Sequence, residues 1–183
     1  AREQAAEADI IVVNHHLFFA DKALKDRGFG ELLPEVDAVI FDEAHQLPEA
    51  AAMYFGQRLS SRQINDLLAD TLREILAAGG DLRGANDLVS LIETRLAHFR
   101  LQLGEDSRKG VWADVSEQAE MPAAIVAVNL SLGALLDALA ALKDRSKGLD
   151  SCHRRAEELG KAFKELTGDT PDNQVHWFET FRK

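Results

Sequence analysis

A pair of acidic residues follows a short apolar run near the start of the chain. The run Ala38–Phe41 has the composition of a buried strand, and Asp42-Glu43-Ala44-His45 comes directly after it. In a parallel sheet, such a pair lies at the carboxyl edge, where α/β proteins bind their ligands. In a nucleotide hydrolase, the first carboxylate can hold Mg²⁺ through its water shell, and the second can deprotonate the attacking water. The simpler alternative is that both acids only solvate a turn.

The other chemically reactive residues form weaker patterns. His15 and His16 follow Asn14 at the end of another apolar run, and they lack the i, i+4 spacing of a helical zinc site. Cys152 has no further cysteine to join it in a metal or redox site. The sequence also holds no Gly-x-x-x-x-Gly-Lys-Ser/Thr loop to cradle a triphosphate. We therefore predict that this chain alone neither binds nor hydrolyses ATP.

Two groups of basic residues are candidates for contact with single-stranded nucleic acid. The first comprises Lys143, Arg145, Lys147, Arg154, Arg155, Lys161 and Lys164, and the second comprises Arg95, Arg100, Arg108 and Lys109. Single-strand channels combine such cations with aromatic side chains on which bases stack, and Trp112 and Phe163 are candidates for that role. The alternatives are solvated helix faces for the cations and core positions for the aromatics.

Composition limits the class of protein. The chain has 183 residues with 21 Lys+Arg against 31 Asp+Glu, a net charge of -10, and one cysteine. A lone cysteine excludes an internal disulfide framework, which indicates a reducing compartment and makes a cytoplasmic location the expectation. We find no run near the ~20 apolar residues of a membrane span and no signal peptide. The acidic balance means that binding to DNA would need a focused basic track.

The order of elements predicts an interrupted α/β fold. We expect strands over 10–13 and 38–41 with a helix over 16–25 between them, and a further strand over 174–181. Between them, apolar residues at helical spacing predict helices over about 60–78, 85–103, 122–142 and 151–166, the first beginning at a capping box that starts with Ser60. The three strands are expected in one parallel sheet, although the chain is mostly α by residue count.

Two segments of the sequence resemble those of a known family. The Asp42–His45 box and the preceding segment from Ala8 to Leu17 look like those of the XPD/DinG-type iron–sulfur superfamily-two DNA helicases, in particular the bacterial DinG and YoaA-like branch. The resemblance implies that residues 1–50 are part of the first RecA-like motor domain and that residues 51–173 form its helical arch insertion. Residues 174–183 would be the strand that returns to the motor domain.

The resemblance also implies roles for individual residues. Asp42 would coordinate Mg²⁺ through water, Glu43 would be the hydrolytic base, and His45 would couple the nucleotide state to other motor motifs. The nucleic-acid contacts would include Asn14, His15, His16, Lys143, Arg145, Lys147, Arg154 and Arg155. The parent enzyme would use ATP, Mg²⁺ and a 4Fe-4S cluster, but this fragment lacks the cluster cysteines and would not hold the cluster.

The helical insertion has two alternative roles. It could help to enclose single-stranded or forked DNA, or it could be chiefly a module that recruits repair or replication proteins. A basic stripe on the bundle favours the first role, whereas an exposed apolar patch of several hundred Å² favours the second. The fragment is also expected to self-associate through an exposed sheet edge.

Overall fold

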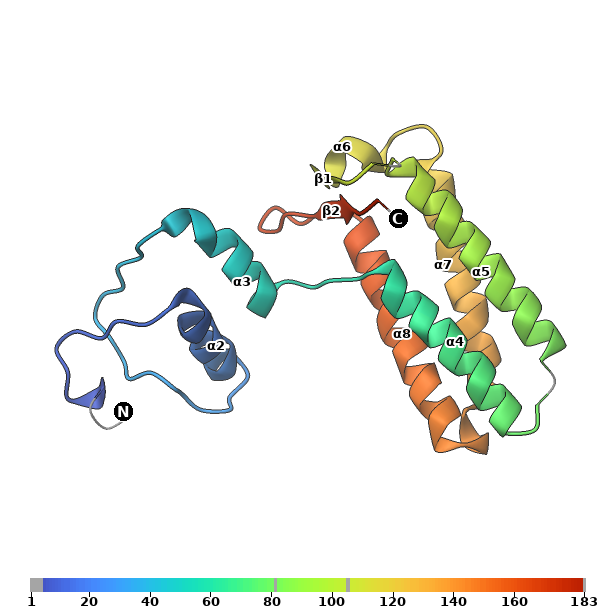
Figure 1. The fold of residues 1–183 in the computed structure, drawn as a ribbon, viewed down its shortest axis with the longest axis horizontal. Coiled ribbons are helices and arrows are strands. Elements are labelled where there is room, and N and C mark those ends of the chain that lie inside the picture. The colour runs from blue at the N-terminus through green and yellow to red at the C-terminus, as the bar shows by residue number, and fades with distance from the viewer. Residues whose placement is uncertain (1–4, 81, 105, 183) are drawn as a thin grey trace. The chain divides into compact units, whose positions relative to one another are not determined.

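The computed structural model describes residues 5–80, 82–104 and 106–182. The chain divides into two compact units, Ala1–Gln57 and Arg58–Lys183. The smaller unit holds the acidic box, and the larger is a helical bundle with a small sheet (Figure 1). Each unit is described by itself.

The larger unit is built from long helices. These are α4 (Ser61–Ala77), α5 (Arg83–Gln102), α7 (Met121–Ala140) and α8 (Lys147–Thr167), with the short helices α6 (Ala113–Ser116) and η2 (Lys143–Arg145) between them. Their inward faces form one apolar core, in which Leu67 and Ile92 are completely buried. The amphipathic spacing predicted from the sequence therefore produces the expected helices, and each lies within a few residues of its predicted position.

Local capping explains where two of these helices begin. The Ser60 side chain accepts a hydrogen bond from the Gln63 backbone N–H, and Gln63 Oε1 accepts one from the Ser60 N–H at 2.8 Å, so the predicted capping box is confirmed. Ser146 caps α8 in a similar way by accepting from the Leu149 N–H at 3.1 Å. Gly79, at φ +71°, adopts the left-handed conformation that follows the end of α4.

The most apolar helix of the bundle is α7. Our sequence expectation that no segment approaches a membrane span is wrong for Met121–Arg145, which is long and apolar enough by length and composition alone. In the structure α7 packs between α5 and α8, and its inward residues Val128, Leu132 and Leu135 are buried in the core. A core helix of a bundle passes the same compositional test, although only 28% of this apolar window is buried in the structure.

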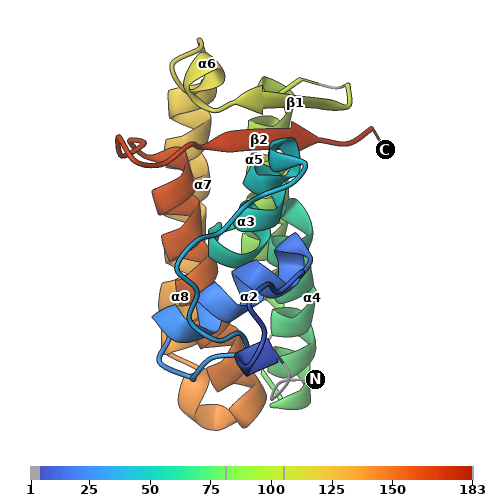
Figure 2. The same ribbon diagram turned by 90° about the vertical axis from the view of Figure 1, so that its left-hand side faces the viewer.

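A two-stranded sheet covers one end of the bundle, where α5 ends and α7 begins (Figures 1 and 2). Strand β1 (Arg108–Val111) pairs antiparallel with β2 (Trp177–Thr180). On its inward side, Phe178 joins Leu103, Trp112 and Met121 in a second apolar cluster. A Cβ at Gly110 would lie 2.8 Å from the Phe178 ring, so the absence of a side chain there lets the ring pack against β1.

The smaller unit contains α2 (His15–Asp26), η1 (Ala44–Gln46) and α3 (Leu47–Phe55). Helices α2 and α3 contact each other through Phe19, whose ring lies 6.5 Å from that of Tyr54 and 6.0 Å from that of Phe55. After α2, the buried Asp21 carboxylate accepts backbone N–H bonds from Leu32 at 2.5 Å and Leu33 at 2.9 Å. These hydrogen bonds hold the loop against the helix and, with the Lys25 ammonium, keep the pKa of Asp21 below its usual value even though burial opposes this.

Two of the predicted strands do not form in the described structure. Residues 10–13 and 38–41 are extended but unpaired, and Ile10, Val12 and Ile40 are 83%, 92% and 95% exposed. A strand needs a neighbour to satisfy its backbone groups, and the described residues supply none to either segment.

The third predicted strand is present as β2, and its partner among the described residues is β1 in an antiparallel pair, so the expected parallel sheet is not shown. Strand β1 lies between two predicted helices, in a segment for which no strand is predicted. The assignment of residues 174–183 to the same domain as residues 1–50 stays a prediction.

Candidate functional site

The acidic box forms a tight turn at the end of the exposed segment 38–41. Asp42 Oδ1 accepts a hydrogen bond from the Glu43 N–H at 2.9 Å, and the Glu43 carbonyl accepts one from the Gln46 N–H at 2.9 Å. Glu43 Oε2 lies 3.2 Å from His45 Nδ1. The side chains of Asp42, Glu43 and His45 are all exposed. The turn therefore presents two carboxylates to solvent, one of them held by a histidine.

The backbone of Glu43 is in an unusual conformation. Its φ of +51° places a non-glycine residue in the left-handed region, a conformation that it shares with Ala119 alone among the described non-glycine residues. Such a conformation costs about 1–3 kcal/mol and is concentrated at functional sites. At this position it turns the chain between Asp42 and η1.

The structure brings the start of α2 close to this turn. The Phe41 ring lies 6.1 Å from the His15 ring and 5.2 Å edge-on from that of Phe18. Asn14 Oδ1 accepts from the Leu17 N–H at 2.7 Å, so this side chain is the N-cap of α2. The ring of His16 instead lies 6.1 Å from that of Tyr54 on α3. Of the predicted nucleic-acid residues in this unit, His15 is the one placed beside the box.

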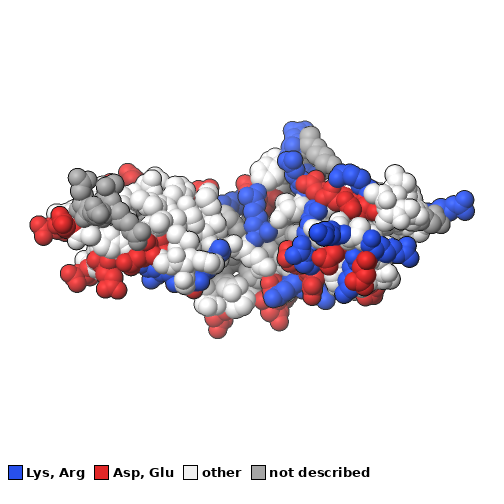
Figure 3. All heavy atoms as spheres, turned by 90° about the horizontal axis from the view of Figure 1, so that it is seen from below, with Lys and Arg blue, Asp and Glu red and all other residues white. Residues whose placement is uncertain are grey.

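The predicted basic residues of the larger unit are mixed with acids. The exposed charges of α8 number four basic and four acidic, namely Lys147, Arg154, Lys161 and Lys164 with Asp150, Glu157, Glu158 and Glu165. Figure 3 shows the same intermixing on the side of the unit that it displays. Lys143 and Arg145 lie on η2 just before this helix. The solvated-face alternative therefore accounts for much of this group.

Arg155 has a structural partner. Its Nη1 donates to Asp70 Oδ2 on α4 at 2.6 Å, and Arg73 lies 2.9 Å from the other carboxylate oxygen. The hydrogen bond from Arg155 is the main reason that the pKa of Asp70 lies below its usual value. This guanidinium therefore ties α8 to α4.

Comparison with known proteins identifies relatives along nearly the whole chain. It is 38% identical to the ATP-dependent DNA helicase YoaA of Haemophilus influenzae and 39% identical to that of Escherichia coli, over 98% of this chain and 28% of each relative. It is also 47% identical to the ATP-dependent DNA helicase DinG of Photobacterium profundum, over 96% of this chain and 24% of that protein. These matches support a DinG/YoaA-like helicase fragment.

This DinG/YoaA-like chain spans about a quarter of the length of these relatives. No protein-family model matches it, and no solved structure does. The resemblance read from the box and the Asn14–His16 segment is therefore confirmed at the level of the family.

The box of this DinG/YoaA-like chain suits a hydrated metal ion. Mg²⁺ keeps several waters and binds proteins through one or two carboxylates plus substrate phosphates. Asp42 uses one oxygen for the turn, and the other oxygen of its exposed carboxylate could accept a hydrogen bond from metal-bound water. The described residues contain no group of three or more His, Cys, Asp or Glu side chains that could hold a metal ion by themselves. An iron–sulfur cluster is not supported by the residues present, because Cys152 is the only cysteine and is buried in the bundle core, where desolvation raises its pKa.

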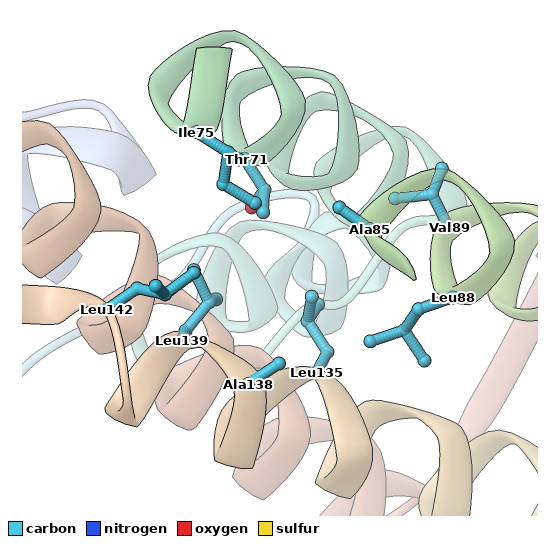
Figure 4. Close-up of a pocket in the computed structure, with 9 residues that line it drawn as sticks. All are labelled: Thr71, Ile75, Ala85, Leu88, Val89, Leu135, Ala138, Leu139 and Leu142. Carbon is cyan, nitrogen blue, oxygen red and sulfur yellow. The ribbon is translucent and has the colours of Figure 1, made fainter. Parts of the chain in front are cut away.

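A small gap in the bundle does not have the chemistry of a nucleotide site. It lies between α4, α5 and α7, and its lining consists of Thr71, Ile75, Ala85, Leu88, Val89, Leu135, Ala138, Leu139 and Leu142 (Figure 4). Thr71 supplies the polar side chain among these residues, and no cation or backbone cradle for a phosphate faces the gap.

The aromatic residues proposed from the sequence as stacking platforms lie in the core. Trp112 and Phe163 are 5% and 3% exposed, so the core alternative is confirmed for both. Sequence reasoning missed Trp177 and Phe181, which are exposed on the small sheet. The alternation of β2 carried the signal, since residues two apart on a strand share a face.

Proposed function

We propose that this chain is a segment of an ATP-dependent DNA helicase, which supplies the acidic box of the motor and a helical arch. The observation that carries the proposal is the 38–39% identity to helicases along nearly the whole chain. The solvent-facing carboxylate pair at a strained turn supports it independently. The parent would act on DNA in the cytoplasm, with ATP and Mg²⁺ as its cofactors.

Asp42 and Glu43 would divide the chemistry between them. Asp42 would hold the water shell of Mg²⁺, which when bound offsets the charge that develops on the phosphates. Glu43 would orient the attacking water and accept its proton on the carboxylate oxygen that His45 leaves free. His45 would fix the carboxylate through its 3.2 Å contact with Oε2, so that movement of the histidine would change the position of the base.

The unpaired apolar segments support a larger sheet in the parent. Residues 10–13 and 38–41 expose β-branched and aromatic side chains that a buried parallel strand would cover. We propose that they pair with further strands of a RecA-like motor domain when these are present. In their absence the segments should promote association between copies, which sedimentation at increasing concentration would reveal.

The bundle of the larger unit would be the arch that helps to enclose single-stranded DNA. The alternative role, recruitment of a repair or replication protein, is favoured by the outward face of α7, where Val126 and Leu130 are 56% and 69% exposed. A Leu130→Lys variant of the parent separates the two roles. Loss of a partner with unchanged DNA binding would support recruitment, whereas retention of every partner would count against it, because an added cation on α7 does not itself weaken binding to DNA.

The test of the motor role is a Glu43→Gln variant of the intact parent enzyme. Glutamine keeps the shape but accepts no proton, so DNA-stimulated phosphate release should fall about 10²–10⁴-fold. Affinity for nucleotide and for DNA should largely persist, because Asp42 still positions the metal. Asp42→Asn is the matched comparison and should also weaken the response to Mg²⁺. Phosphate release by Glu43→Gln at the parent's rate would show that the pair is only a solvated turn.

A further inference from the structure

The outward face of the small sheet carries exposed aromatic residues. Its members are Lys109, Val111, Trp177 and Glu179 of the two strands, together with Phe181 directly after β2, and we call these five residues the sheet face. Trp177 is 49% exposed, Phe181 59% and Val111 48%. Large apolar side chains at this exposure gain little from folding, so their presence together needs another explanation.

The sheet does not depend on these side chains for its own stability. Its inward side is anchored by Phe178 in the apolar cluster, and by Thr180, whose hydroxyl donates to the Asp106 carbonyl at 2.6 Å and accepts from the Arg108 N–H at 3.1 Å. The backbone N–H of Trp112 extends the pairing by donating to the His176 carbonyl at 2.9 Å. These inward contacts and backbone hydrogen bonds therefore hold the two strands in place without a contribution from the outward side chains.

The ring of Trp177 is fixed by its neighbours. Val111 is its direct partner across the strands, and the Lys109 ammonium lies 3.4 Å from the centre of the indole. Trp177 is held in this way and is still 49% exposed, so it would lose little freedom when a flat group stacks on the exposed part of its ring. The lysine then places a positive charge beside whatever stacks there.

Two exposed cations lie beside the aromatic residues of the sheet face. The described charged side chains on the strands and within three residues of them are Arg108, Lys109 and Arg182, against Asp106, Asp114 and Glu179. Arg108 lies over the Phe178 ring at 4.9 Å, and Arg100 donates to the Phe181 carbonyl. Lys109 and Arg182 are exposed and can reach an anion. The charge of the region is balanced, and these two cations are the ones next to exposed aromatics.

We infer that the sheet face is a stacking platform for single-stranded DNA. Bases would stack on Trp177 and Phe181, while Lys109 and Arg182 would contact the intervening phosphates. Aromatic side chains on a sheet beside cations are the combination that non-specific single-strand binding requires, because every base offers a flat apolar face. The inference rests on the proposed arch function and assigns its DNA contact to the sheet face in place of α8.

The experiment measures binding of the 183-residue chain to fluorescein-labelled oligo-dT by anisotropy. Trp177→Ala should weaken binding about 5- to 100-fold, and Phe181→Ala should weaken it in the same direction. Lys109→Ala should lower the slope of log affinity against log salt by roughly 0.7, whereas Trp177→Ala should leave that slope unchanged. Lys161→Ala on α8 is the matched control and should change affinity less than twofold.

Intrinsic fluorescence gives a second readout that does not depend on a variant folding correctly. The two tryptophans are Trp112, which is buried, and Trp177. Stacking on Trp177 should quench emission as oligo-dT is added, and Trp177→Ala should abolish the quenching. The inference is overturned if the wild-type chain shows no quenching on binding, if Lys161→Ala weakens binding more than Trp177→Ala, or if the chain does not bind oligo-dT. None of these results touches the motor role, which the phosphate-release assay on Glu43 tests separately.

Discussion

The ion pair between α4 and α8 gives a prediction about how the bundle is held together. Arg155 Nη1 lies 2.6 Å from Asp70 Oδ2, and the two side chains are 37% and 31% exposed. Fully exposed pairs contribute about 0.2–1 kcal/mol, and hydrogen bonds to charged groups contribute about 1.5–3 kcal/mol. Because water still reaches about a third of this pair, we expect a coupling energy of about 1 kcal/mol.

The single variants should differ in a way that the geometry determines. Arg155→Gln leaves Asp70 with Arg73 at 2.9 Å, so it should destabilise the unit by about 1 kcal/mol. Asp70→Asn removes the charge that both arginines share, so it should cost more, about 1–2 kcal/mol. The double variant should be no less stable than Asp70→Asn alone, because the arginine has already lost its partner.

Urea unfolding followed by tryptophan emission is the assay. Trp112 and Trp177 are the only tryptophans and both lie in Arg58–Lys183, so emission reports this unit alone. Arg62 and Asp66, also on α4 but 89% and 61% exposed at 3.7 Å, form the matched control cycle, with an expected coupling near zero. Equal coupling in both cycles would refute the reasoning.

The same pair predicts a pH dependence. The Arg155 hydrogen bond lowers the pKa of Asp70 in the folded state from its usual 3.8. The stabilisation is therefore complete above the unfolded value and is lost as the pH falls through the folded one. The stability difference between wild type and Asp70→Asn should persist at pH 5 and 7 and should shrink below about pH 4. A difference that grows on acidification would contradict the assignment.

Two further predictions concern nucleotide binding by the chain and the reactivity of the Cys152 thiol. Calorimetry on the 183-residue chain should detect no micromolar affinity for ATP, because the sequence holds no phosphate-cradling loop, and measurable binding would mean that a different site exists. Cys152 is buried and desolvation raises its pKa, so its thiol should react with a disulfide reagent at pH 8 at least about 100-fold more slowly in buffer than in urea, and equal rates would show that this part of α8 is open.

The long helices could be predicted from the sequence because their determinants are local. The capping box at Ser60, the apolar stripes and Gly79 all lie within the helix that they define or within a few residues of its ends. Helix α3 was missed because its Ala-rich sequence has little amphipathic contrast. Strand β1 was missed because Arg108-Lys109-Gly110 has the composition of a loop, and only its distant partner β2 makes it a strand.

The acidic box could be located from the sequence, but its geometry could not. The types and order of Asp42, Glu43 and His45 predicted their chemistry, whereas the left-handed backbone at Glu43 and its contact with His45 depend on how the turn closes. Charge alone could not show which of the basic residues assigned to DNA contact already have an acidic partner. Arg155 has an acid from another helix as its partner, which no local pattern reveals.

The unpaired segments of the smaller unit show why the larger unit forms a complete core by itself and the smaller unit does not. A helix satisfies its backbone within itself, so the bundle needs only its own four stripes to close a core. A buried parallel strand needs neighbours on both edges and cover on both faces, and residues 10–13 and 38–41 find neither among the described residues. The box at the end of 38–41 is thus positioned only by its own turn and by α2. Catalysis requires the carboxylates to be held within about 0.5 Å of their productive positions, which a free strand end cannot achieve. The larger unit therefore forms a complete core by itself, whereas the proposed catalytic role of the acidic box would require further strands to fix its carboxylates.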